Sequence, residues 1–133
     1  MTFGEFITQK RLALDMEQQD LAEAIGLSAP YMSNIIAGRK PMPQDESMLS
    51  KLAAVLRLSR DDQGVLFDLA AQAGYDTNAL PIDLTGFLQK HRGTVFAALR
   101  VARDANVSDD QFEAFMARLH ADIQSQQGGE EDA

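Results

Sequence analysis

Residues 10–40 read KRLALDMEQQDLAEAIGLSAPYMSNIIAGRK and contain the signals for two short helices joined by a glycine turn. The first helix should end at Gly26, because a left-handed helix end favours glycine. The second should begin after Ser28, whose hydroxyl can cap a helix, and Pro30 falls in its first turn, where a missing N–H loses no partner. It should end before Gly38. Together with a helix that precedes them, the pair predicts three consecutive helices.

The second helix of the pair, residues 29–37, has one apolar face. Met32, Ile35 and Ile36 recur at helical spacing, so this face should pack on the preceding helix. The side chains mostly off this face, which are left to contact something else, are Ala29, Pro30, Ser33 and Asn34. This layout is how a small helical protein presents one helix to the major groove of DNA.

The stretch resembles the Xre family, the phage repressor and Cro type of helix-turn-helix regulators. The resemblance covers residues 3 to about 70, and several matches are in register across three expected helices. The matching residues are Lys10-Arg11-Leu12, Met16-Glu17-Gln18, Leu21-Ala22, Gly26, Tyr31, Ser33 and Gly38-Arg39.

The resemblance implies which residues would contact DNA. Gln18 would touch a phosphate from the start of its helix. Ser28, Tyr31, Arg39 and Lys40 would flank the groove and hold the backbone. Ala29, Pro30 and Asn34 would face base edges, and of these only Asn34 has the paired donor and acceptor that read an adenine edge. Lys10, Arg11 and Ser33 complete the expected interface.

Two positions depart from the family pattern. The family often has an acidic residue at position 36, which pairs with the arginine of the first helix, and a small polar residue at position 37. Here these are Ile36 and Ala37, so Arg11 is released for a phosphate or another partner. Each expected contact also has a structural interpretation, in which Gln18 is merely solvated, Tyr31 packs, and Arg39 and Lys40 are ordinary loop charges.

The charge of the chain opposes DNA binding as a whole. The net charge is −8, with 7 basic and 10 acidic residues through Tyr75 and 5 basic and 10 acidic residues after it. The basic residues of the first part nevertheless cluster near the proposed groove, at Lys10 and Arg11 and at Arg39 and Lys40. Few phosphate contacts imply modest affinity for one subunit, so DNA binding should require dimerisation.

Composition excludes several other classes of protein. The chain has no cysteine, which rules out disulfides and thiolate metal sites. Its N-terminus has no apolar signal core, and no apolar run approaches the ~20 residues that a membrane span requires. We therefore expect a folded cytoplasmic protein of 133 residues without a membrane segment.

Helical periodicity continues along the rest of the chain and predicts an all-α fold. A fourth helix should span residues 44–58, and a fifth should follow Ser59 and end at Gly74. We expect a five-helix DNA-binding domain at residues 1–74, a linker at 75–82, a C-terminal segment of about three helices at 83–126, and a disordered acidic tail at 127–133.

The last expected helix has a sharp apolar stripe. Its members recur at three- and four-residue spacing and are Phe112, Phe115, Met116, Leu119 and Ile123. One interpretation covers this stripe with the two helices before it and with the fifth helix. The other makes it the two-fold interface that a symmetric repressor needs on a palindrome.

Catalysis has little support in the sequence. The two histidines, His91 and His120, are far apart, and the chain lacks an HExxH motif, a glycine-rich phosphate loop and a cysteine nucleophile. Paired acids at 61–62 and 109–110 lie at expected helix starts, where the helix dipole favours them. We predict no enzyme activity, no cofactor and no metal site.

These observations predict a homodimeric, sequence-specific repressor that binds double-stranded DNA at an inverted repeat. The alternative from another class is an antitoxin or adaptor, whose acidic C-terminal helices bind a basic protein partner such as a toxin or a protease.

Overall fold

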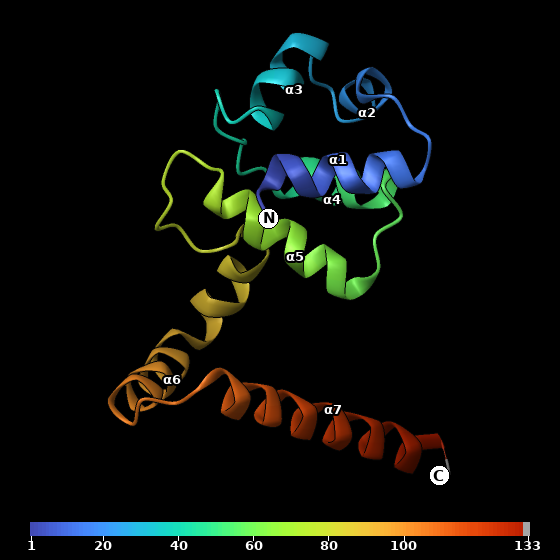
Figure 1. Cartoon of the computed structure of the whole chain (residues 1–133). Helices are drawn as coiled ribbons and strands as arrows, with labels where there is room; N and C mark the ends of the chain where they lie inside the picture. The colour runs from blue at the N-terminus through green and yellow to red at the C-terminus, as the bar shows by residue number, and fades with distance from the viewer. Residues whose placement is uncertain (132–133) are drawn as a thin grey trace. The chain divides into compact units, whose positions relative to one another are not determined.

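The computed structural model describes residues 1–131, and Figure 1 shows them as a chain of helices. The elements are α1 (Phe3–Ala13), α2 (Gln18–Ala24), α3 (Ala29–Ile36), α4 (Glu46–Val55), α5 (Arg60–Gln72), a short 3₁₀ helix (Ile82–Leu84), α6 (Thr85–Asp104) and α7 (Asp109–Glu131). The all-α fold with an N-terminal helix-turn-helix is confirmed, and α2 and α3 are the pair that the sequence predicts.

The chain divides into two compact units, residues 1–89 and 90–133. This division falls later than the linker expected at 75–82. The loop from Tyr75 to Leu80 is exposed, but Ile82 packs against the core of the first unit and the 3₁₀ helix contacts α5. An apolar residue just after the polar loop therefore returns the chain to the first unit before the second begins.

The first unit encloses the hydrophobic core. The largest fully buried side chains come from α1 to α5 and from the loop before α4, and are Ile7, Leu21, Met32, Met42, Leu49, Leu52 and Leu66. Packing joins α3 to both α1 and α2, and Figure 1 shows α2 and α3 beside α1. The position of α3 is therefore fixed by two neighbouring helices.

Side-chain caps begin most of these helices. The hydroxyl of Ser28 accepts a hydrogen bond from the Tyr31 N–H at 3.2 Å, and that of Ser59 accepts one from the Asp62 N–H at 3.1 Å. Gly26 and Gly38 each have φ of +78° after α2 and α3. Glycine adopts this conformation without steric cost, which explains why both helices end where the sequence predicts.

The second unit has a different character, because no side chain of residues 90–127 is buried. The backbone of α6 is non-helical at His91, with φ −119° and ψ 22°, so its apolar pattern is divided into two segments as the sequence suggests. Ser108 and Gln111 form a reciprocal cap at the start of α7, in which the Ser108 N–H donates to Gln111 Oε1 at 2.9 Å.

The end of α7 differs from expectation. The helix continues to Glu131, so residues 127–131 of the tail expected to be disordered are helical, and residues 132–133 lie outside the described part. Gln124, Gln126 and Gln127 are good helix formers that lead into this continuation, whereas the helix propensity of Gly128 and Gly129 opposes it.

One carboxyl group has a shifted pKa. Partial desolvation, and secondly the nearby charge of Asp83, raise the pKa of Asp68 above its ordinary value where α5 meets the 3₁₀ helix.

No helix in residues 1–131 combines the length and apolar content needed to cross a membrane.

Candidate nucleic-acid interface

The outer side of α3 is open to solvent. Ser28, Ala29, Pro30 and Ser33 are exposed, whereas Met32 and Ile35 on the opposite side are buried in the core. Ser28 caps the helix with its hydroxyl, and Pro30 lies in the first turn as predicted. The helix therefore presents its start and its polar side outward, which is the arrangement that entry into a groove requires.

The polar residues at the end of α3 lie together. Arg39 Nη1 donates a hydrogen bond to Asn34 Oδ1 at 3.3 Å, and the backbone N–H groups of Arg39 and Lys40 donate to the Asn34 carbonyl at 2.8 and 3.2 Å. Asn34 is half-buried, and Arg39 and Lys40 are exposed. The only expected base-reading amide of the helix is thus held beside the guanidinium group of Arg39 and the backbone of Lys40.

The loop that carries Arg39 and Lys40 is anchored to the end of α5. The Met42 N–H donates to the Ala73 carbonyl at 2.9 Å. Gln44 Nε2 donates to the carbonyls of Met42 at 2.9 Å and of Ala70 at 2.7 Å. Because Met42 is also fully buried, the loop has little freedom, and the cations at its start are held near α3.

A close contact between α1 and α3 sets the position of this same end of α3. A Cβ atom at Gly4 would clash with the backbone carbonyl of Ile36, so the two backbones approach more closely than any other residue at position 4 permits. Sequence reasoning missed Gly4. The available signal was a lone glycine inside a helical pattern, flanked by the core residues Phe3 and Phe6.

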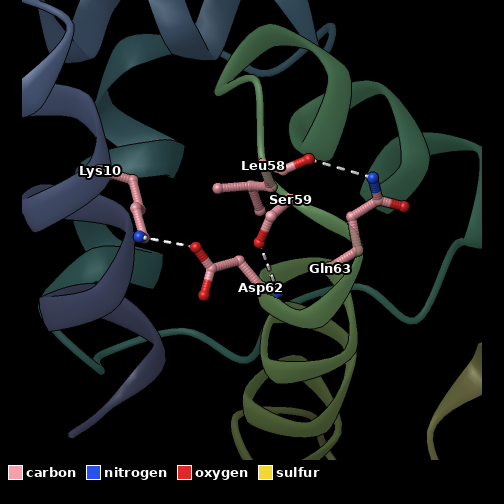
Figure 2. A network of polar contacts seen from close by, with 5 residues as sticks. All are labelled: Lys10, Leu58, Ser59, Asp62 and Gln63. Atoms are coloured by element: carbon pink, nitrogen blue, oxygen red, sulfur yellow. Dashed lines mark hydrogen bonds and ion pairs between the residues drawn. The ribbon is translucent and has the colours of Figure 1, made fainter.

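Lys10 is engaged within the protein. Figure 2 shows its side chain reaching from α1 to Asp62 on α5, with Lys10 Nζ 2.8 Å from Asp62 Oδ2. The ammonium group also lies 5.6 Å from the centre of the Phe6 ring. Asp62 lies in the first turn of α5 and its N–H is capped by Ser59. These contacts join α1 to α5 and engage the Lys10 ammonium group within the protein.

Arg11 also has an internal partner. Its Nη1 donates to the Met16 carbonyl at 2.9 Å, and the Met16 N–H donates to the Arg11 carbonyl at 3.1 Å. Arg11 Nε is buried and makes no hydrogen bond within the part of the chain that the structure describes. With Ile36 in place of an acidic residue, Arg11 holds the turn between α1 and α2, which is the second of the two roles the sequence left open.

The two remaining residues expected to contact DNA, Gln18 and Tyr31, are each partly exposed. Gln18 is the first residue of α2 and is half-buried, and the side chain of Glu17 before it forms no cap with the helix. Tyr31 is half-buried and packs against the core. Tyr31 therefore contributes to packing, which is the structural role that the sequence allowed as the alternative to a DNA contact.

The apolar stripe of α7 is uncovered in a single chain. Phe112, Phe115, Met116, Leu119 and Ile123 are 40%, 57%, 51%, 45% and 50% exposed. In the second unit α6 and α7 are connected by a short turn, and Figure 1 shows them diverging from it. Beside this turn lies a groove of about 330 Å³, lined by Leu99, Ala102, Arg103, Asn106, Val107 and Phe112. Within the second unit, α6 meets the stripe only at Phe112 beside this groove and leaves the other four side chains exposed.

The described residues contain no group of three or more acidic or histidine side chains placed to hold a metal ion.

Residues 7–63 match a family model described as helix-turn-helix. The match begins in α1 and ends in α5, and it includes the whole of α2, α3 and α4. No curated protein and no solved structure matches the chain.

Proposed function

We propose that the chain, which carries a helix-turn-helix domain of the Xre and Cro-like family in residues 7–63, is a homodimeric repressor of transcription. The family match supports a DNA-binding regulator in general. We propose further that each subunit inserts α3 into the major groove of one half of an inverted repeat in double-stranded DNA, acting in the cytoplasm.

The observation that carries this proposal is the flank of α3 formed by Asn34, Arg39 and Lys40. The amide of Asn34 can accept from the N6 amino group of adenine and donate to its N7. Arg39 donates to the same amide oxygen, which has a second lone pair, and thereby orients the side chain toward the exposed edge of the helix. Arg39 and Lys40 would bind phosphates next to the reading position.

The backbone contacts would be completed by residues at the starts of two helices. Gln18 at the first position of α2 would donate to a phosphate, and Ser28 would do so from the start of α3. Ala29 and Pro30 are exposed and apolar, so they can contact a thymine methyl group but cannot read a hydrogen-bonding pattern. With one direct reader per subunit, the shape of the groove should contribute much of the specificity.

Dimerisation supports this function because one subunit has few cations to place on phosphates. The stripe of α7 is the surface we propose for the two-fold contact, since half-exposed aromatic and aliphatic side chains at five positions leave a large apolar area in water. A two-fold dimer would place the centres of its two half-sites about one helical turn, ~34 Å, apart.

Replacing Asn34 with alanine tests the proposed reading of bases. We expect Asn34→Ala to weaken binding to the duplex that the protein selects by about 1–3 kcal/mol, roughly 5- to 150-fold, while binding to unrelated duplexes is unchanged. The measurement is fluorescence anisotropy of labelled duplexes at several salt concentrations. Equal losses on all sequences would refute a role for Asn34 in base reading.

Arg39→Ala serves as the matched comparison. It should weaken binding to both kinds of duplex and reduce the slope of log K against log salt by about one unit, because one phosphate contact is lost. Arg39→Lys should restore the salt slope but not the full preference for the selected duplex, because lysine lacks the planar fork that orients Asn34.

A further inference from the structure

The two helices of the second unit carry opposite charges. In α6 four residues are lysine or arginine and one is acidic, whereas α7 contains six acidic residues and one arginine. A basic helix is unusual in a chain with a net charge of −8. The two helices both carry apolar side chains, but they differ in the sign of their charge.

On both helices the charges lie beside the apolar side chains. Arg100 and Arg103 line a groove of about 200 Å³ together with Phe96 and Leu99. On α7, Glu113 follows Phe112 and Asp122 precedes Ile123, so helical geometry places these carboxylates along the two edges of the stripe. Each helix thus has an apolar centre and a charged border of one sign, which is the usual composition of an interface.

These charges are not neutralised between the helices of one subunit. Within the described residues, no lysine or arginine of α6 forms an ion pair with α7, and the one ion pair in this unit joins the sequence neighbours Arg103 and Asp104 at 3.0 Å. Both of those side chains are about 70% exposed. The charged borders are therefore available to another molecule.

We infer that, in the dimer proposed above, α6 of each subunit lies against α7 of the partner subunit. The inference rests on the proposed function. The basic border of α6, at Arg100 and Arg103, then faces the acidic border of the partner's α7, and two-fold symmetry repeats the contact. Packing α6 on α6 and α7 on α7 would instead oppose like charges, which is unfavourable. An acidic or a basic foreign partner would match only one of the two helices, whereas a second copy matches both.

Charge reversal on one helix at a time tests this arrangement in the full-length protein. The double variant Arg100→Glu with Arg103→Glu should raise the Kd of dimerisation on the order of tenfold or more at low salt, because like charges then meet at both symmetric contacts. Glu113→Lys with Asp122→Lys should have the same effect. The Kd values are measured by sedimentation equilibrium, and the difference from wild type should shrink near 1 M salt, where screening acts over ~3 Å.

An equimolar mixture of the two variants is the decisive arm. All four positions are exposed in one subunit, and in the mixture each reversed helix meets an opposite charge, so a heterodimer with a Kd near that of wild type should form. The control Lys51→Glu with Arg60→Glu makes the same change of charge at exposed positions of α4 and α5 and should leave dimerisation unchanged.

The outcomes separate this inference from the proposed function. A wild-type dimer whose Kd does not respond to reversal of α6 alone, or a mixture that fails to form a heterodimer, overturns the pairing of α6 with α7 and leaves the repressor proposal standing. A wild-type protein that remains monomeric at tens of micromolar overturns both.

Discussion

Replacing Phe115 with aspartate is expected to convert the protein into a monomer and to abolish tight binding to an inverted repeat. Phe115 is central in the α7 stripe and 57% exposed in one subunit, so the folded subunit should tolerate the change. The dimer loses two buried aromatic side chains. At about 1.5–3 kcal/mol for each, the Kd of dimerisation should rise by about 100-fold or more.

Val101→Asp is the matched control for this prediction. Val101 lies on α6, is 68% exposed and is two residues beyond Leu99, which places it on the opposite side of the helix. Light scattering coupled to size-exclusion chromatography should find a monomer for Phe115→Asp and a dimer for Val101→Asp. If both variants dimerise as wild type does, the α7 stripe is not the interface.

Gly4→Ala is expected to destabilise the protein by about 1–3 kcal/mol, although alanine is the better helix former. The new methyl group would clash with the Ile36 carbonyl, and a backbone atom cannot rotate away as a side chain can. The end of α3 must then move away from α1, taking Asn34 and the loop with Arg39 with it. Urea unfolding followed by circular dichroism measures the loss, and affinity for the selected duplex should fall in parallel.

Gly64→Ala makes the same chemical change in α5, where nothing lies within 4 Å of the added Cβ. It should stabilise the protein by roughly 0.5–1 kcal/mol, because glycine is unfavourable inside a helix. The two substitutions are therefore expected to have opposite signs. A stabilising Gly4→Ala would contradict the close approach of α1 and α3.

The parts of the fold that depend on neighbouring residues could be predicted from the sequence. Ser28, Ser59 and Ser108 cap α3, α5 and α7, and Gly26 and Gly38 follow α2 and α3 with positive φ. Each of these signals acts within about one helical turn, so the residue type alone carries the information. The exposed side of α3 followed from the spacing of Met32, Ile35 and Ile36.

The parts that depend on residues far apart in the sequence could not be predicted. Lys10 pairs with Asp62 across 52 positions, and Gln44 binds the carbonyl of Ala70 across 26. The family resemblance and the charge pattern placed Lys10 among the expected DNA contacts, and neither reveals which residue it pairs with inside the fold. The return of Ile82 to the first unit likewise depends on packing near α5 and not on the polar loop before it.

The surface that we propose for dimerisation could be only partly predicted from the sequence. The stripe of α7 could be predicted from its periodicity, but a stripe covered within one subunit and a stripe that binds a second copy have the same pattern. The difference between them lies in what packs on the stripe, which depends on parts of the molecule that periodicity does not describe.

The most direct measurement is the selection of bound duplexes from a random pool by the purified full-length protein. We expect enrichment of an inverted repeat whose half-site centres lie about 34 Å apart, with one adenine in each half-site whose preference disappears for Asn34→Ala. A pool that shows no consensus after repeated rounds, with binding that depends only on salt concentration, would contradict it.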